Sequence, residues 1–429
     1  MKRPKVMIAV WSEYLLEDIG CFSKGEGLPR SELQDLGVPC IRYGEIYTHH
    51  HFIVNTLVSW ISGESAKSSV KAATNTLLFA GSGETLEDIG KCVAYMGKES
   101  ICVGGDIVIL AVHERRARAD YLSYWLNTEG RRQMNRLGQG QSIVHITPKH
   151  LAKIRLPVPP LPEQTAIAEV LACWDKAIRL YERKLEMNRE IKKGLMRKLL
   201  AGEWRLPGFS GKWASARFGE VFGFVKTYAY SREQLTIRGA GSSILNIHYG
   251  DLHSSYTDIL LDVGNEKQIP EIKIGVDVPD DLNCLRDGDL VIADASEDYK
   301  GVGACVEIKN VGDRKLIGGL HTMVARDSDG RTVPGYRGYI LKETVVAKTM
   351  QQMATGVSVH GLSKSNLSKI AIRLPSPDEQ HAIASVLADA DKDISCLASK
   401  LTLLRDQKKY LLSKLVTGAI RLPQFREAS

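Results

Sequence analysis

Three short stretches of the sequence, at 113–120, 130–141 and 225–234, gather side chains that can contact nucleic acid. Arginine and glutamine can bind phosphates and the edges of bases, and the third stretch mixes basic residues with tyrosines. Taken singly, each stretch is explained better by a solvated charged face than by a contact with nucleic acid. The candidate DNA-binding residues are Arg115, Arg116, Arg118, Arg131, Arg132, Gln139, Gln141, Lys226, Tyr228, Tyr230 and Arg232.

Sequence motifs of catalysis are missing. No G-x-x-x-x-G-K-[ST] phosphate loop, G-x-S-x-G elbow, H-E-x-x-H or N-P-P-[YF] tetrapeptide occurs. His49, His50 and His51 are adjacent, so they converge on one metal ion only if the loop curls, and no metal site is expected. The sequence therefore predicts a protein that binds rather than catalyses, without catalytic residues.

The chain is a tandem duplication. PPLPEQTAIAEVLACWDKAI (159–178) returns as PSPDEQHAIASVLADADKDI (375–394), and AGEWRLPGF (201–209) returns as TGAIRLPQF (417–425). The likeness extends upstream, where IRYGEI (41–46) matches IHYGDL (247–252). A period this long indicates that each copy is a full domain plus a connector.

Some segments do not align between the copies: 24–37 against 226–243, 48–76 against 253–289, and 113–120 against 327–336. Matched segments are expected to build the common frame. Unmatched segments are where two copies of one fold could read different partners.

A long helix follows each domain, with apolar residues at alternating spacings of four and three, which is the heptad seam of a coiled coil. Two equivalent units around a two-fold axis bring the helices together antiparallel. The expected register sets Trp174 against Lys408, so that the indole ring covers the lysine stem. It also sets Lys192 beside Ala390, a small residue past which the ammonium group would reach water. The alternative is that each helix covers only its own domain. The candidate helix-pairing and docking residues are Ile167, Leu171, Trp174, Ile178, Tyr181, Leu185, Ile383, Leu387, Ile394, Leu397, Leu401 and Leu411.

The expected fold class is α+β, with two mixed α/β domains separated by a long antiparallel two-helix coiled coil in a pseudo-two-fold tandem duplication. Proline-rich connectors mark the boundaries, because proline continues neither a strand ladder nor a helix. The expected segments are a first domain at 1–155, a first helical region at 156–208, a second domain at 209–371 and a second helical region at 372–429. Helices of about 35–40 residues would make a rod of roughly 50–60 Å.

Composition adds a mild constraint on location and partners. The net charge of +7 fits a nucleic-acid partner without demanding one. No apolar run is long enough for a membrane span, and acidic residues follow the basic start too soon for a secretory signal, so a cytoplasmic protein is expected. Eight scattered cysteines suit free thiols in a reducing compartment.

The two Pro-Glu-Gln helices and their RLP tails, in the order domain, helix, domain, helix, resemble the specificity subunit of type I restriction–modification enzymes. The resemblance covers essentially the whole chain, although SPDEQ stands where the fuller PPLPEQ would be expected. It implies that the two mixed domains are target-recognition domains, each reading one half of a split, asymmetric site on double-stranded DNA. The paired helices would set the unread gap.

The same resemblance implies the partners. This subunit would be non-catalytic and would recruit two modification (methyltransferase) subunits and the restriction (translocase and nuclease) subunits. S-adenosylmethionine, ATP and magnesium would belong to those partners. From the residues alone, a coiled-coil DNA-binding or scaffold protein unrelated to methylation stays open as an alternative.

Overall fold

The protein consists of two compact units that each combine one mixed domain with one end of both long helices. A computed structural model describes residues 11–140, 144–256, 258–356 and 359–426. Unit 1 is Met1–Tyr181 with Lys400–Ser429, and unit 2 is Glu182–Ser399. This division falls inside both helices, so the predicted boundaries between domains and helical regions stay a prediction.

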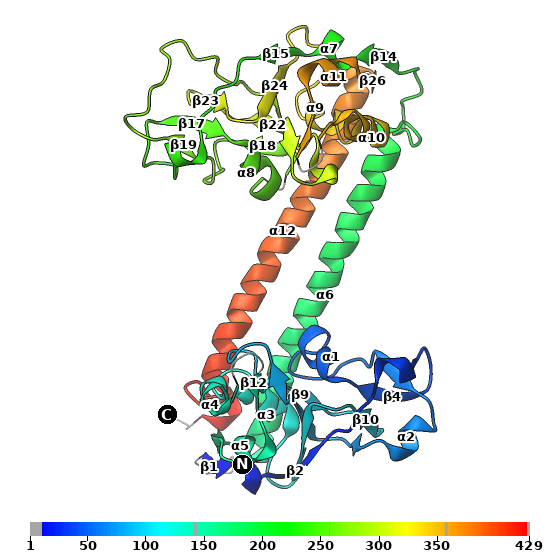
Figure 1. Ribbon diagram of the computed structural model, residues 1–429, viewed down its shortest axis with the longest axis vertical. Coiled ribbons are helices and arrows are strands. Elements are labelled where there is room, and N and C mark those ends of the chain that lie inside the picture. Colours follow the sequence, from blue (N-terminus) through cyan, green and yellow to red (C-terminus); the bar gives the residue numbers. More distant parts are fainter. Residues whose placement is uncertain (1–10, 141–143, 257, 357–358, 427–429) are drawn as a thin grey trace, which may run out of the picture. The chain divides into compact units, whose positions relative to one another are not determined.

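The mixed domain of unit 1 contains two main sheets (Figure 1). The first is antiparallel in the order β2-β11-β7-β9, and five of the six residues of its central strand β11 are buried, as expected of a strand covered on both faces. The second has the order β3-β5-β4-β10-β6, with β4 and β10 parallel. The strands are β1 (Ser12–Leu15), β2 (Gly20–Lys24), β3 (Leu33–Gln34), β4 (Val38–Ile41), β5 (Ser59–Ile61), β6 (Lys71–Ala72), β7 (Thr76–Ala80), β8 (Ser82–Gly83), β9 (Cys92–Tyr95), β10 (Ile101–Val103), β11 (Ile107–Val112), β12 (Val144–His145) and β13 (Arg155–Val158).

Short helices cover these sheets, and α3 is buried throughout against β7 and β9. Two further strand pairs, β1 with β13 and β8 with β12, connect segments that lie far apart in the sequence of the domain. The helices of this domain are α1 (Tyr43–Thr48), α2 (Ser65–Ser68), α3 (Ala119–Leu126), α4 (Arg131–Leu137) and α5 (Pro148–Leu151).

Unit 2 repeats this plan. Its first sheet has the order β15-β24-β20-β22-β18, and its second sheet, β16-β19-β17-β23, again contains one parallel pair, β17 with β23. The strands are β14 (Ala214–Arg217), β15 (Gly223–Val225), β16 (Leu235–Thr236), β17 (Ile244–Ile247), β18 (Leu260–Asp262), β19 (Glu271–Ile272), β20 (Leu290–Ala293), β21 (Ala295–Ser296), β22 (Cys305–Lys309), β23 (Lys315–Gly318), β24 (Thr322–Arg326), β25 (His360–Gly361) and β26 (Ala371–Leu374). The helices are α7 (Phe218–Val221), α8 (Tyr249–Ser254), α9 (Arg337–Ile340), α10 (Thr344–Met353) and α11 (Lys364–Lys369).

The long helices α6 (Leu161–Leu200) and α12 (Pro377–Leu415) have 40 and 39 residues. Each ends before a glycine with positive φ, Gly202 at 66° and Gly418 at 71°. Left-handed backbone favours glycine and closes the last helical turn. A Cβ atom at either glycine would meet a tryptophan ring, Trp213 or Trp11, at 3.4 Å. Glycine therefore ends each helix and lets the returning chain pack closely.

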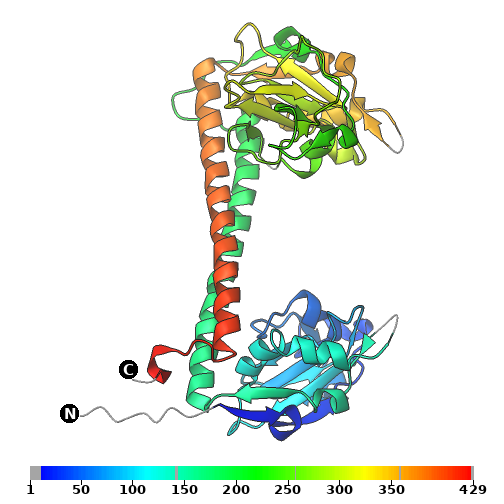
Figure 2. The same ribbon diagram turned by 90° about the vertical axis from the view of Figure 1, so that its left-hand side faces the viewer.

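Within each unit the two helices lie side by side and antiparallel (Figure 2). In unit 1, Ile167 near the start of α6 shares a core with Leu415 at the end of α12. In unit 2, Leu199 near the end of α6 shares a core with Ile383 near the start of α12. All twelve predicted seam residues are buried or half-buried, and full burial of one such side chain stabilises by roughly 1.5–3 kcal/mol.

The outer ends of the seam also belong to the cores of the mixed domains. Ile167 and Leu171 lie in one cluster with Tyr121 and Leu156 of the first domain. The helices thus pair with each other and also cover their own domains. Both predictions from the heptad spacing, a paired seam and a helix packed on its domain, therefore apply. No described helix is long and apolar enough to cross a membrane.

Candidate nucleic-acid interface

In unit 1, a buried glutamate at the start of α6 binds the segment that follows α12. Glu163 is 1% exposed and accepts hydrogen bonds from Arg421 at 2.5 and 2.8 Å and from Trp11 Nε1 at 3.1 Å. A carboxylate this deeply buried needs such charge-assisted partners. Because Arg421 follows the end of α12, this Glu163 joint connects segments 258 positions apart in the sequence.

Unit 2 contains the same joint with the roles of the helices exchanged. Glu379, near the start of α12, accepts hydrogen bonds from Arg205 at 2.5 and 2.7 Å and from Trp213 Nε1 at 3.0 Å. Arg205 belongs to the RLP tail that follows α6. Each repeated Glu-Gln motif therefore binds the tail of the other helix, which explains why the motif and the tail recur together.

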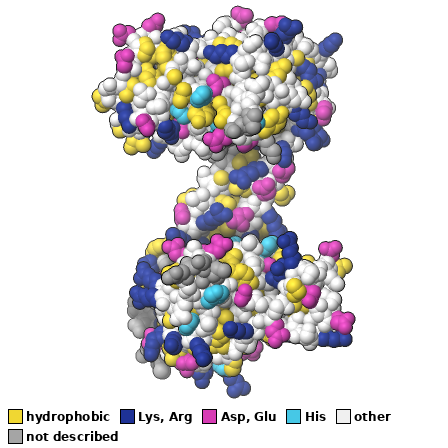
Figure 3. Space-filling view, viewed as in Figure 1, with side chains coloured by type: hydrophobic (Ala, Val, Ile, Leu, Met, Phe, Trp, Pro, Cys, Tyr) yellow, Lys and Arg dark blue, Asp and Glu magenta, His cyan; other side chains and the backbone are white. Residues whose placement is uncertain are grey.

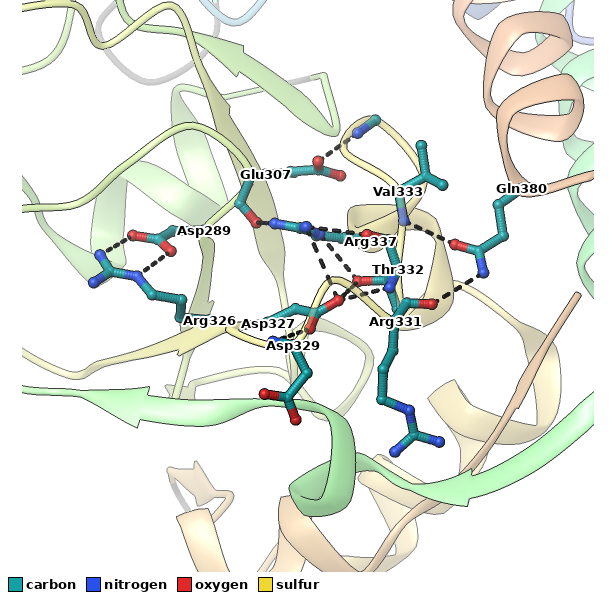
Figure 4. A network of polar contacts seen from close by, with 12 residues as sticks. Asp289, Glu307, Arg326, Asp327, Asp329, Arg331, Thr332, Val333, Arg337 and Gln380 are labelled. Atoms are coloured by element: carbon teal, nitrogen blue, oxygen red, sulfur yellow. Dashed lines mark hydrogen bonds and ion pairs between the residues drawn. The ribbon is translucent and has the colours of Figure 1, made fainter. Parts of the chain in front are cut away.

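The glutamine beside each glutamate holds a loop of its mixed domain. Gln164 accepts a hydrogen bond from the backbone N–H of Arg118 at 2.8 Å and donates to the carbonyl of Arg116 at 3.1 Å. Gln380 makes the matching pair of contacts with Val333, at 2.8 Å, and Arg331, at 3.3 Å (Figure 4). The two loops are the unmatched segments 113–120 and 327–336, so a constant side chain fixes a variable loop in both units.

Unit 2 adds a buried polar network behind this loop (Figure 4). Arg337 is 7% exposed and donates to the side chain and the carbonyl of Thr332, both at 3.0 Å. Asp327 accepts from the backbone N–H of Thr332 at 2.6 Å. Burial acts to raise the pKa of Asp327, but the hydrogen bonds from Thr332 and Arg331 outweigh burial and lower that pKa. The loop in unit 2 is thus held rigidly from inside, which suits a surface that must present side chains in a fixed pattern.

A second joint fixes each mixed domain to both helices. In unit 1, Tyr124 Oη donates to Asp175 of α6 at 2.6 Å, and Lys408 of α12 pairs with the same carboxylate. The Lys408 ammonium also lies 4.2 Å from the ring centroid of Phe52. Burial lowers the pKa of Lys408, and Asp175 opposes that shift. The predicted aromatic cover by Trp174 is wrong, because Phe52 of the mixed domain supplies the ring.

In unit 2 the corresponding joint consists of Tyr339, Asp391 and Lys192. Tyr339 Oη donates to Asp391 at 2.9 Å, and Lys192 pairs with that carboxylate. The prediction that Lys192 reaches water past Ala390 is wrong, because the neighbouring residue provides a carboxylate and leaves the Lys192 side chain 16% exposed.

A cleft of about 990 Å³ lies beside this second joint, within unit 2. Positively charged side chains outnumber negatively charged ones along it, which makes it a further candidate surface for phosphates. Sequence patterns missed this surface because its residues come from α6, α12 and the mixed domain. The charged residues that line it are Arg189, Glu190, Lys192, Lys193, Arg197, Asp258, Lys342 and Asp391.

The predicted DNA-binding residues of unit 1 divide into exposed and internally bonded side chains. Arg115, Arg132 and Gln139 are exposed, and Arg116 is exposed while donating to the carbonyl of Asp18 at 2.6 Å. These four remain available to a partner. Gln141 lies outside the described residues.

Two other arginines of unit 1 support the fold. Arg118 forms a two-pronged ion pair with Asp120, at 3.1 and 2.6 Å, and that partner raises the pKa of Arg118. Arg131 donates to the carbonyls of Ile89 and Glu87, and burial lowers the pKa of Arg131. A role in DNA contact stays a prediction for both.

In unit 2, Lys226 is exposed and lies 5.3 Å from the ring centroid of Tyr228. Tyr228 and Tyr230 are buried, and their hydroxyls donate to backbone carbonyls at 3.4 and 3.2 Å. Arg232 is bound to Asp251 at 2.8 Å, although 62% of its side chain is exposed. Among the described residues, no three His, Cys, Asp or Glu side chains lie so that they could hold a metal ion.

Comparisons with known proteins agree on one family. The profile of the type I restriction modification DNA specificity domain matches residues 10–188. The putative type I restriction enzyme MjaX specificity subunit of Methanocaldococcus jannaschii is 24% identical over 355 residues, which are 78% of this chain and 76% of that protein. The MjaVIII specificity subunit of the same organism is 23% identical over 296 residues, 66% of each protein.

Solved structures give the same fold. The type I restriction–modification S subunit from M. genitalium has a TM-score of 0.59 at 15% identity, covering 96% of this chain and 98% of that one. A chain from a structure of complex assembly and conformational transition of the type I R-M system has a TM-score of 0.56 at 16% identity, covering 95% and 97%. At these identities the likeness concerns the fold.

The buried joints generate a stability prediction. Replacing Glu163 by glutamine (Glu163→Gln) should lower the free energy of unfolding by about 2–4 kcal/mol, because Arg421 loses its buried counter-charge. The matched control is Glu190→Gln, which removes an exposed pair with Lys193 and should change stability by less than about 0.5 kcal/mol. Urea denaturation of both variants measures the difference, and equal effects would show that the Glu163 joint does not hold unit 1 together.

Proposed function

Because the chain belongs to the family of type I restriction–modification specificity subunits, we propose that it reads a bipartite, asymmetric site on double-stranded DNA, with one mixed domain on each half. The observation that carries this proposal is the duplicated frame with unlike loops. Both units keep the same glutamate, glutamine and tyrosine–aspartate–lysine joints. The two loops that the glutamines hold, within 113–120 and 327–336, differ in sequence, as two readers of different half-sites require.

The proposed role is non-catalytic. The chain would hold neither S-adenosylmethionine nor ATP nor magnesium, and those cofactors would act in partner subunits. Location in the cytoplasm, with access to DNA, belongs to the same proposal. The alternative of a coiled-coil DNA-binding or scaffold protein unrelated to methylation is not favoured, because the family profile and the named relatives are all of the restriction type.

The long helices supply the proposed docking surface for two modification subunits. Beyond the paired seam, α6 exposes Leu180, Met187 and Ile191, and α12 exposes Leu403 and Tyr410, each between 54% and 63% exposed. Within unit 2, Met187 and Ile191 are four residues apart and therefore lie on one face of α6. A helix of a modification subunit could bury these residues, and the restriction subunits would join through that assembly.

The helices would also set the length of the unread gap between the two half-sites. Both are continuous over 40 and 39 residues, and neither contains a proline after its first turn. A continuous helix is stiff enough to fix a spacing along its axis.

The direct test is to sequence the methylated bases of a host with and without this gene. The proposal expects a split motif with two specified halves and an unspecified gap, present only when the gene is intact. Persistence of every methylated motif after deletion would contradict the proposal. A single uninterrupted motif that disappears on deletion would contradict the bipartite part alone.

The exposed arginines give a second prediction. Arg115→Ala combined with Arg132→Ala should weaken DNA binding by the assembled complex and make the dependence of affinity on salt shallower, by roughly one unit of slope for each lost phosphate contact. Lys149→Ala combined with Lys153→Ala, at two exposed lysines in and just after α5, removes the same charge from the same unit and is the matched control. Filter binding over a range of salt concentrations measures both. Unchanged affinity and slope would mean that the two arginines form only a solvated face.

A further inference from the structure

One surface of unit 2 gathers histidines around a tyrosine at the first turn of α8. The ring centroid of Tyr249 lies 4.8 Å from that of His248, 6.4 Å from His253 and 5.3 Å from His321. His321 in turn contacts Asp294, with Nδ1 and Oδ1 3.2 Å apart. We call these five residues the Tyr249 cluster. Histidine side chains are visible on the face of this domain drawn in Figure 3.

The cluster combines supporting and accessible side chains. His248 is 7% exposed and its Nδ1 accepts the N–H of Gly250 at 3.2 Å, so it begins the helix. Burial lowers the pKa of His248, which keeps the ring in the neutral form that can accept. By contrast, the side chains of His321 and Asp294 are 52% and 34% exposed, and His253 is exposed.

Unit 1 holds the same backbone frame. The N–H of Asp294 donates to the carbonyl of His321 at 3.1 Å, and the N–H of Gly81 donates to the carbonyl of Asp106 at 2.7 Å. Each pair joins the end of one sheet strand, β20 or β7, to the residue before its neighbour, β24 or β11. Positions 81 and 294 therefore correspond, as do positions 106 and 321.

The first turn of the short helix corresponds as well. His253 Nε2 contacts the carbonyl of Ala295 at 3.1 Å, and Tyr47 Oη donates to the carbonyl of Ser82 at 2.9 Å. In both units this side chain meets the edge of the tyrosine that opens the helix, which is Tyr43 in unit 1, at 5.4 Å. Both units thus contain the same set of hydrogen bonds and ring contacts at these positions.

On this constant frame the functional groups differ. The opening tyrosine is the same in both units, and the four other positions change between unit 1 and unit 2. The differing pairs are Arg42 and His248, Tyr47 and His253, Gly81 and Asp294, and Asp106 and His321. A change of donors and acceptors on an unchanged backbone is the pattern expected where two copies recognise different hydrogen-bonding partners.

The backbone at 106 and 321 strengthens this argument. Asp106 has φ of 58° and His321 has φ of 52°, a left-handed conformation that glycine adopts most readily. Both units nevertheless place an exposed side chain there, and the two side chains differ. Non-glycine residues held in this region are concentrated at binding sites.

We propose that the Tyr249 cluster is the base-reading surface of unit 2, with His321 and His253 contacting base edges in the major groove, and that the matching positions do this in unit 1. This inference rests on the proposed function. A carboxylate can only accept, so in its neutral form His321 carries the proton on Nδ1, toward Asp294, and presents Nε2 as an acceptor. An acceptor complements the exocyclic amine of adenine or cytosine. Arg232, bound to Asp251 of the same helix, borders the cluster and can reach the backbone phosphates.

The test uses two variants of His321 in the complete complex. His321→Gly removes the side chain while suiting the left-handed backbone, so it should fold. Discrimination at one base position in one half of the methylated motif should fall roughly tenfold, with the other half and the gap unchanged. His321→Asp supplies the group that unit 1 carries at this position and should change the preferred base there.

His381→Ala, at an exposed histidine of α12, is the matched control and should leave the motif unchanged. Methylation sequencing reads all three variants against the wild-type protein. Wild-type motifs in both His321 variants would overturn the inference. Complete loss of methylation in both variants, while the control stays active, would also overturn it, because His321 would then be needed for folding. A wild-type protein without a split motif would instead overturn the proposed function.

Discussion

The structure depends on a buried carboxylate that one helix supplies and the tail of the other helix neutralises. Glu163 and Glu379 are each 1% exposed, and each is bound by an arginine that follows the opposite helix and by a tryptophan that begins the adjoining domain. An unpaired charge at such a depth would destabilise the fold by several kcal/mol. Neither unit can therefore complete its fold without segments from both halves of the chain. The two repeats depend on each other and are not two independent domains in series.

Much of this architecture could be predicted because the sequence contains two copies of the same repeat. The repeat gave the two mixed domains, and the heptad spacing gave helices whose seam residues are all buried or half-buried. The Glu-Gln motif and the RLP tail were visible as repeats, but no one-dimensional pattern says that Glu163 binds Arg421 rather than Arg205. That assignment follows only from antiparallel pairing in three dimensions.

The candidate site was less predictable, for physical reasons. Runs of arginine do not distinguish Arg115, which is exposed, from Arg131, which binds two backbone carbonyls. The partner of Lys408 was misassigned because a third element, the loop that contains Phe52, enters the helix pair. Sequence patterns do not reveal the Tyr249 cluster, because its members come from the start of α8 and from two strand ends. Only their backbone hydrogen bonds show that they correspond to residues of unit 1.

The proposal that continuous helices set the spacing between two DNA-reading units can be tested directly. Four residues inserted between Tyr181 and Glu182 in α6, and four between Ser399 and Lys400 in α12, fall at the boundary between the compact units, so every joint described here stays on one side. The insertion adds about 6 Å of helix, roughly two base pairs of DNA. Methylation sequencing should then find the same two half-sites with a gap about two base pairs longer. An unchanged gap in an active variant would contradict the claim.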